Sequence, residues 1–404
     1  MSTRDTTLKR AQSELQAGRF DAGLALAGEV LADDPDDGEA HYMAAIASRY
    51  LMQFEAAADH LSKLHEAMPQ YGRAWQEQGH LALAQGDAAG ALAAFVQATR
   101  FNPSLEASWR EQARLQAEAD HPAEAQAAAA QRERLANLPR ELVAVTNHLA
   151  EGRLLRAEEI CRHYLRRRPQ DVEGMRLLAK IGIEFGVLDE AEFLLESAVV
   201  FAPDDLQLRL DYIDALRRRQ NFARALEEAE ALHQRDPENP LFQSRLAIES
   251  MQAGDYDKGL KLFDKVLEQL PSDPATLTSR GHALKTTGAQ ADAIASYRAA
   301  IAAKPDHGDA WYALANLKTY RFSEADLDQM RKLASRSDLA FMDRVHLSFA
   351  LGKACEDHGD YAASFAHYRE GNALKLAQSR YSAERMSEEL TKQREICAPA
   401  LFAK

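Results

Sequence analysis

The sequence is poor in cysteine and in aromatic residues. Three cysteines, Cys161, Cys355 and Cys397, lie far apart in 404 residues, and aromatic residues make up 7% of the chain. So few and so widely spaced cysteines give neither a disulfide framework nor the paired spacing of a zinc site, which favours a reducing compartment. The scarcity of aromatic residues, beside many alanines and leucines, favours closely packed helices over sheets.

The sequence also lacks a net positive charge and long apolar runs. The formal net charge is −13, whereas proteins that bind nucleic acids or anionic membranes are usually basic. No stretch approaches the roughly 18 consecutive apolar residues of a membrane-spanning helix. The N-terminal residues lack the apolar core of a signal peptide. We therefore expect a cytoplasmic protein with neither a nucleic acid nor a membrane as its partner.

Catalytic and metal-binding motifs are absent from the sequence. There is no GxxxxGK[ST] phosphate-binding loop, no HExxH motif and no paired Cys/His spacing among the 13 histidines. We expect no catalytic residue, no metal and no cofactor in this chain. His80 and His282 each follow a glycine in a helical pattern, and we interpret them as surface residues of a groove rather than as ligands or bases.

Prolines recur every 34 residues in two series, and a fixed period of this length indicates stacked repeats. The prolines are Pro35, Pro69 and Pro103, then Pro169, Pro203, Pro237, Pro271 and Pro305. Three other positions of the repeat, called columns here, carry the same kind of residue at a fixed distance before the proline in most units. Seventeen residues before the proline stand Gly18, Gly86, Gly152, Gly186, Gly254 and Gly288. Twelve before it stand Gly23, Ala57, Ala91, Ala157, Ala191, Ala225, Gly259 and Ala293, and eight before it often stands a large apolar residue, as at Leu61, Phe95, Leu195, Phe263 and Tyr297.

Each column has a physical reason in a pair of antiparallel helices. The glycine ends the first helix in a left-handed conformation. The small residue lets the two backbones approach, and the large apolar residue fills the seam between units. The proline ends the second helix and opens the next unit. One such pair cannot bury its apolar face alone, so the pairs must stack.

These columns resemble the tetratricopeptide repeat. The clearest unit is "AWQEQGHLALAQGDAAGALAAFVQATRFNPS", and its matching residues are Trp75, Gly79, Ala91, Phe95, Ala98 and Pro103. The resemblance covers most of the chain. It implies an all-α fold, a right-handed superhelical solenoid of about ten tetratricopeptide-like helix pairs.

The repeat is irregular in two places, which suggests four segments. The unit that starts near Ser108 lacks the large apolar residue, and its proline is displaced to Pro139. This marks either a kink in the superhelix or a boundary between two blocks. After Trp311 the loop glycine is missing, and Ser323 followed by acidic residues predicts the N-cap of an additional helix. The expected segments are two repeat blocks, a junction and a C-terminal linker helix, over residues 1–138, 139–307, 308–375 and 376–404.

The segment 308–375 also resembles a known junction. "DAWYALANLKTYRFSEADL" and "LSFALGKACEDHGDYAASFAHYREGNALK" look like the region that joins repeats to catalysis in bacterial tetratricopeptide-repeat sulfotransferases. The resemblance implies a PAPS-dependent sulfotransferase domain further on. The sequence stops at "REICAPALFAK", so PAPS would be a cofactor only of such a domain, and no PAPS-contacting residue can be assigned here. Without the resemblance, the pattern favours an irregular terminal repeat that caps the solenoid, because the end of a repeat stack needs a cap.

Two surfaces are candidate partner-binding sites. Projecting the repeat register onto the first helices predicts a groove lined by Tyr42, Arg49, His80, Arg114, Arg176, Lys180, Arg218, Arg245, His282, Lys285, Tyr312 and Asn316. This set lacks the asparagine ladder of O-GlcNAc transferase repeats and the carboxylate clamp of chaperone-tail binders. A basic cluster is formed by Arg162, Arg166, Arg167 and Arg168. It is either a solvated helix end or a patch for an anionic peptide or an acidic neighbouring domain.

Two functions follow from these patterns. The first is a module that recruits or orients a protein or peptide acceptor for a sulfotransferase domain. The alternative is a stand-alone scaffold or adaptor unrelated to sulfation. The C-terminal helix carries Met386, Leu390 and Ile396, which we interpret either as a self-association strip or as a linker helix that packs on a further domain.

Overall fold

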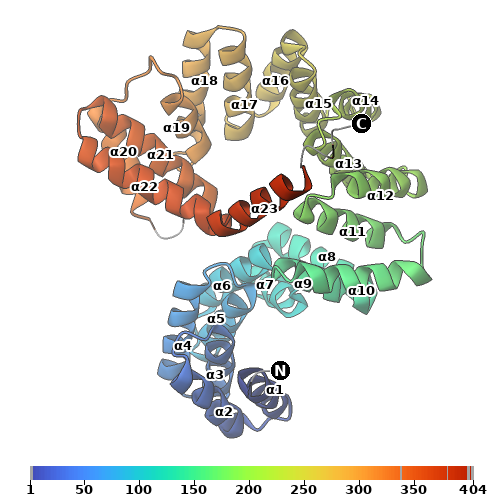
Figure 1. Cartoon of the computed structure of the whole chain (residues 1–404), viewed down its shortest axis with the longest axis vertical. Helices are drawn as coiled ribbons and strands as arrows, with labels where there is room; N and C mark the ends of the chain where they lie inside the picture. The colour runs from blue at the N-terminus through green and yellow to red at the C-terminus, as the bar shows by residue number, and fades with distance from the viewer. Residues whose placement is uncertain (1–2, 337–338, 380, 398–400, 402–404) are drawn as a thin grey trace. The chain divides into compact units, whose positions relative to one another are not determined.

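The computed structural model describes residues 3–336, 339–379, 381–397 and 401, and all regular structure in them is α-helical (Figure 1). The chain divides into two compact units, residues 1–215 and 216–404. The first unit contains α1 (Thr3–Gln16), α2 (Phe20–Asp33), α3 (Gly38–Tyr50), α4 (Phe54–Ala67), α5 (Gly72–Ala84), α6 (Ala88–Phe101), α7 (Glu106–Glu118), α8 (Pro122–Asn137), α9 (Arg140–Ala150), α10 (Leu154–Arg167), α11 (Val172–Phe185) and α12 (Leu188–Phe201). The division falls within α13 (Leu206–Arg218).

The second unit continues the pattern of helix pairs. It contains α14 (Phe222–Arg235), α15 (Pro240–Gln252), α16 (Tyr256–Gln269), α17 (Pro274–Thr286), α18 (Gln290–Ala303), α19 (Gly308–Ala315), α20 (Glu324–Ala334), α21 (Phe341–Asp357), α22 (Tyr361–Gln378) and α23 (Ala383–Ile396). Within each unit, consecutive helices such as α5 and α6 or α17 and α18 pack against each other, and pairs pack on neighbouring pairs, as α4 does on α5 and α16 on α17 (Figure 1). The predicted all-α solenoid of helix pairs is confirmed.

The repeated prolines mark helix starts and are held by a recurrent hydrogen bond. Eight first helices, from α3 to α19, begin three residues after a proline. The side chain six residues after the proline often donates to the proline carbonyl. The indole N–H groups do so at 2.8 to 2.9 Å in the pairs Trp75–Pro69, Trp109–Pro103 and Trp311–Pro305. The turn between units therefore has one of its carbonyls satisfied by the next helix.

The loop between the helices of a pair requires a left-handed residue. All six glycines of the predicted column have positive φ, between 69° and 91°. Three units have no glycine there, and Met52, Asp120 and Gln220 adopt φ values of 62°, 59° and 63° instead. Because a left-handed conformation costs a residue other than glycine roughly 1–2 kcal/mol, the loop geometry is imposed by the packed helix pair.

The predicted seam residues form the core. Leu61, Phe95, Leu195, Phe263 and Tyr297 are at most 1% exposed. A glycine of the paired first helix makes room for two of the rings. A Cβ atom added to Gly79 would lie 2.7 Å from the Phe95 ring, and one added to Gly281 would lie 2.4 Å from the Tyr297 ring.

The irregular unit at α7 and α8 lies inside the first compact unit. Of the 16 residues of α8, Ala128 is the buried one. Helix α9 then begins directly after Pro139, and the Asn147 side-chain oxygen accepts hydrogen bonds from Arg73 at 3.2 Å and Asn102 at 2.9 Å. These hydrogen bonds join α9 to the N-terminal repeats.

The junction near the end of the second unit contains the predicted extra helix. Ser323 and Asp326 form a reciprocal capping box at the start of α20. Burial of Asp326 opposes its ionisation, but the Arg298 guanidinium, at 2.6 and 2.7 Å, and Ser323 lower its pKa to about 2. Helix α19 packs on α21, which pairs with α22. The predicted N-cap and the additional helix are both confirmed.

The predicted segment boundaries at 138, 307 and 375 follow the sequence periodicity and stay predictions. In the C-terminal segment, α23 has no buried residue, and residues 398–400 and 402–404 lie outside the described residues. Among the helices that the structure describes, none has the length and apolar character needed to cross a membrane.

Candidate functional site

Two adjoining cavities lie in the first unit. One, of about 550 Å³, lies between α1, α3, the start of α5 and the end of α9. The other, of about 470 Å³, lies between α1, α3 and the start of α2. Both are lined by Gln12, Tyr42, Met43 and Arg73. Together the two cavities are called here the N-terminal groove.

The smaller cavity is an apolar chamber. Leu15, Phe20, Met43, Ile46 and Tyr50 line it. The Phe20 and Tyr50 rings are stacked, with centroids 4.2 Å apart and planes at 5°. Such a chamber can accept a large apolar side chain, because apolar walls with a few polar groups are typical of ligand sites.

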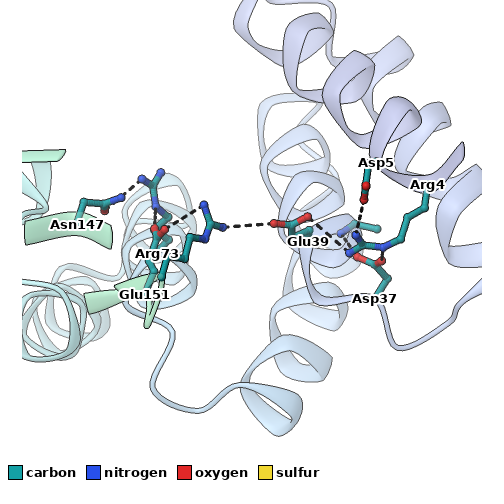
Figure 2. Close-up of polar contacts among 9 residues, drawn as sticks. Arg4, Asp5, Asp37, Glu39, Arg73, Asn147 and Glu151 are labelled. Atoms are coloured by element: carbon teal, nitrogen blue, oxygen red, sulfur yellow. Dashed lines mark hydrogen bonds and ion pairs between the residues drawn. The ribbon is translucent and has the colours of Figure 1, made fainter. Parts of the chain in front are cut away.

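The larger cavity is a polar chamber centred on Arg73 (Figure 2). The Arg73 Nε donates to Glu151 at 2.5 Å, and its terminal nitrogen donates to Asn147 at 3.2 Å. The Glu151 side chain is 6% exposed, so this pair lies well inside the wall. Tyr42 packs edge-on against Tyr71 at 5.7 Å, and burial raises the pKa of both hydroxyls, which therefore stay neutral.

Figure 2 shows a series of ion pairs and hydrogen bonds among charged side chains at the polar chamber. Arg153 lies 3.4 Å from both Glu39 and Glu151. Glu39 also lies 3.6 Å from Arg4, which pairs with Asp37 at the N-cap of α3. The chamber lining holds three acidic residues, Asp5, Glu39 and Glu151, and three basic ones, Lys9, Arg73 and Arg153. Because the two signs balance, the net charge of the chamber favours neither an acidic nor a basic ligand.

Of the predicted groove residues in the first unit, Tyr42 lines the N-terminal groove. Arg49 lies beside it, ion-paired with Glu77 and 4.3 Å from the centre of the Tyr50 ring. The remaining predicted residues lie away from it. Arg114 pairs with Glu111 and Glu118, Arg176 pairs with Glu173 and Asp211, His80 packs edge-on against Phe95, and Lys180 is exposed.

The predicted groove residues of the second unit are spread over several helices. The His282 Nδ1 atom lies 2.9 Å from the Tyr297 hydroxyl, and Tyr312 stacks on His346 with ring centres 5.1 Å apart. Arg245 lies 4.0 Å from the buried Glu249. Arg218, Lys285 and Asn316 are exposed.

Two of the four arginines of the basic cluster at the end of α10 are ion-paired with neighbouring glutamates. Arg162 bonds to Glu158 at 2.8 Å and to Glu190 at 2.7 Å, and Arg167 bonds to Glu141 at 3.0 Å. Arg166 donates to a carbonyl of its own helix at 3.4 Å, and Arg168 lies over the Tyr164 ring. These contacts fit the solvated helix end better than an anion-binding patch.

The sequence reasoning missed Arg73, Glu151 and Arg153, which form the polar wall. Arg73 and Glu151 are 78 residues apart. No repeat column predicts their contact, because α9 reaches α5 through the irregular unit. The displaced proline at Pro139 indicates that the repeat is interrupted there. It does not indicate which helices α9 will contact.

Burial lowers the pKa of four histidines of the first unit, namely His60, His65, His80 and His148. Their folded pKa values lie below the unfolded value of about 6.5. The unfolded chain therefore binds more protons, and the stability present above that pH is lost as the pH falls below it. We expect the urea midpoint of the first unit to fall between about pH 7.5 and about pH 5.5.

His65 gives the matched variant for this prediction. Its ring lies 4.1 Å from that of Trp75, and neither ring nitrogen has a hydrogen-bond partner among the described residues. His65→Phe should keep the ring contact and flatten the pH dependence, whereas the same change at the exposed His121 should not. Equal pH dependence in wild type and His65→Phe would contradict the assignment.

Other chemistry finds little support in the described part of the chain. No group of three or more His, Cys, Asp or Glu side chains is arranged there to hold a metal ion. Burial raises the pKa of the Cys161 thiol to about 12, so its thiolate is scarce at neutral pH. Cys355 is buried as well, and burial also raises its pKa.

Comparison with known proteins confirms tetratricopeptide repeats in this chain. Family models described as tetratricopeptide repeat match residues 8–71, 216–279 and 278–317. A comparison with curated proteins gave no match. Such repeats build extended concave binding surfaces, so they support a protein-interaction scaffold.

Several solved structures are distantly similar. MamA, residues 41 to the end, from Desulfovibrio magneticus RS-1 is 13% identical with a TM-score of 0.37, over 42% of this chain and 98% of its own. The human IFIT1 dimer with PPP-AAAA is 16% identical with a TM-score of 0.38, over 91% of this chain and 89% of its own. Likenesses this distant indicate no ligand and no function.

Proposed function

We propose that the N-terminal groove binds a segment of a partner protein. The observation that supports this proposal is that an apolar chamber and a charged chamber adjoin and share four lining residues. Concave repeat surfaces bind extended or helical segments through many weak contacts. On this proposal the chain acts as a protein-interaction module and not as an enzyme.

The two chambers define the kind of segment that fits. The apolar chamber, of about 470 Å³, takes one large aliphatic or aromatic side chain. The neighbouring wall presents Arg73 and Arg153 beside Glu39 and Glu151, so the flanking residues carry charges of both signs. A strongly acidic or strongly basic segment would leave some of these side chains facing a like charge, which costs binding energy.

A peptide-display library selected on the full chain supplies the probes for a test. The selected peptides should lose at least about tenfold in affinity, which equals about 1.4 kcal/mol, when Ile46→Glu puts a charge into the apolar chamber. Gln16→Trp, from an exposed position in its lining, fills the same space without altering the core. Leu155→Glu on α10, where the side chain is 76% exposed, is the control. Peptides that bind both groove variants as well as wild type would rule out this groove.

The resemblance of residues 308–375 to the junction of bacterial tetratricopeptide-repeat sulfotransferases supports a narrower proposal. If this chain precedes a sulfotransferase domain, the partner segment is the acceptor that the repeats recruit or orient, and PAPS is the cofactor of that domain. The coding sequence beyond Lys404 tests it. An open frame with a glycine-rich phosphate-binding loop supports the narrower proposal, and a stop codon contradicts it in favour of a stand-alone scaffold.

Two further proposals concern the setting of the chain. A reducing, cytoplasmic location is proposed from its cysteine content. Self-association through α23 is proposed because Met386, Leu390 and Ile396 are 46%, 54% and 69% exposed. A monomeric mass in solution at high concentration would contradict self-association.

A further inference from the structure

We propose that a cavity between α14 and α16 is a second binding site, which takes an acidic helical segment of a partner protein that also carries one large apolar side chain. The cavity has a volume of about 630 Å³, and its lining comes from α14, α15 and α16. All three helices belong to the second unit. The site is therefore separate from the N-terminal groove and goes beyond the function proposed for it.

Part of the cavity lining is apolar. Leu246 of α15 and Leu262 of α16 contribute to it, and both are buried. Helix α15 packs on both α14 and α16, so these two leucines are held by the packing of three consecutive helices. A cavity of this volume lies within the range that is typical of ligand sites. It can accept one leucine or phenylalanine side chain of a partner.

Three lysines of α16 line the same cavity, and two of them are available to a ligand. Lys258, Lys261 and Lys265 follow one another at intervals of three and four residues, which places them on one face of the helix. Lys258 is ion-paired with Glu230 of α14 at 2.6 Å. Lys261 and Lys265 are exposed, and no ion pair joins either of them to a carboxylate among the residues that the structure describes.

The acidic residues of the lining are occupied in other ways. Glu230 binds Lys258, and Asp255 caps α16 by accepting a hydrogen bond from the Lys258 backbone N–H at 3.0 Å. Asp257 lies in the first turn of α16, where the helix dipole favours a negative charge. The end of the cavity that holds Lys261 therefore presents positive charge, in a protein whose net charge is −13.

The three lysines are particular to this unit and are not part of the repeat pattern. They stand 13, 10 and 6 residues before Pro271. In the other units that carry the repeated proline, no unit has a lysine or arginine at more than one of these three positions. The packing of helix pairs, which all units share, therefore does not account for the lysines.

The positions of the lysines define the chemistry of the partner. Lys261 and Lys265 are one helical turn apart, about 6 Å along the axis, so two carboxylates four residues apart on a partner helix match their spacing. Carboxylates fit better than a phosphate group, because the lining contains no arginine that could bind phosphate with two parallel hydrogen bonds. The N-terminus of α16 is also occupied, since Asp255 caps it.

Fluorescence anisotropy with the full chain tests the site. The probe is a labelled synthetic helical peptide with two glutamates four residues apart and a leucine on the same face. It should bind the double variant Lys261→Glu with Lys265→Glu at least about tenfold more weakly than wild type, because each glutamate then faces a like charge. Gln234→Trp, at an exposed position of the lining, should also weaken binding because it fills the cavity. Circular dichroism checks that the variants keep their helices.

A matched pair of lysines and a charge swap complete the design. Lys63→Glu with Lys318→Glu changes the net charge equally at exposed positions outside the cavity and should leave binding unchanged. Lys63 occupies the same repeat position in α4 as Lys265 does in α16. A peptide with lysines in place of the glutamates should bind the variant with glutamates at 261 and 265 more tightly than wild type.

Three results would overturn the site. They are no binding of the glutamate peptide to wild type, equal binding to wild type and to the variant of Lys261 and Lys265, and an equal loss in the control with Lys63 and Lys318 changed. Ile46→Glu in the N-terminal groove should leave binding of this peptide unchanged. A failure of the second site is therefore distinguishable from a failure of the N-terminal groove.

Discussion

Replacing Trp311 with alanine is expected to lower the free energy of unfolding of the second unit by about 3–5 kcal/mol. The Trp311 side chain is completely buried, and its ring centre lies 6.0 Å from that of Phe322. Its removal leaves a cavity in the core between α19, α20 and α21. The Pro305 carbonyl also loses the indole N–H that bonds to it at 2.9 Å.

Trp109 is the control for this change. It makes the equivalent bond to Pro103 at 2.9 Å, but its side chain is partly exposed. Trp109→Ala should therefore cost clearly less. Urea unfolding followed by circular dichroism measures both losses, and hydrogen exchange should locate the loss of protection for Trp311→Ala in residues 277–355. If Trp311→Ala lowers the free energy of unfolding no more than Trp109→Ala does, burial of the tryptophan does not determine how much it contributes to stability.

Replacing Gly281 with valine is expected to destabilise the second unit by about 1–3 kcal/mol or more. A Cβ atom at this position would lie 2.4 Å from the Tyr297 ring, and that side chain is completely buried. The valine must therefore push α17 and α18 apart or force Tyr297 from its rotamer. The expected result is a lower thermal midpoint with weaker protection of both helices.

Two further variants separate this clash from a general effect of losing a glycine. Nothing lies within 4 Å of a Cβ atom added to Gly28 in α2, so Gly28→Ala should stabilise the first unit by up to about 1 kcal/mol. Gly281→Ala combined with Tyr297→Leu should cost less than the sum of the two single changes, because the smaller side chain relieves the contact. Additive losses would argue against a clash at this seam.

The repeat register explains why so much of the fold could be predicted. The glycine loops, the buried seam residues and the helix starts after the prolines are all local or nearest-neighbour features, and they recur in each unit. The N-cap at Ser323 was predictable for the same reason, since its hydrogen bonds span three residues. Such features depend on a few neighbouring residues, so a single sequence contains enough information to place them.

The candidate site was much less predictable. Of the twelve projected groove residues, Tyr42 lines the N-terminal groove. Others on the same face are held in ion pairs, as Arg176 is with Asp211. A register projection says which way a side chain faces, but not whether a neighbour fills the space in front of it. The basic cluster shows the same limit, because the glutamates that neutralise Arg162 and Arg167 come partly from other helices.

The sequence by itself determined that this chain is a stack of helix pairs, since period, loop glycines and seam residues depend on contacts within one unit or with the next. The tertiary structure alone decided where a groove forms. The contacts between Arg73 and Glu151 and between Glu39 and Arg153 join residues 78 and 114 positions apart. They exist because the unit before Pro139 departs from the repeat and returns α9 to the N-terminal helices. No periodic pattern contains that path, because it results from the packing of the irregular unit against its neighbours.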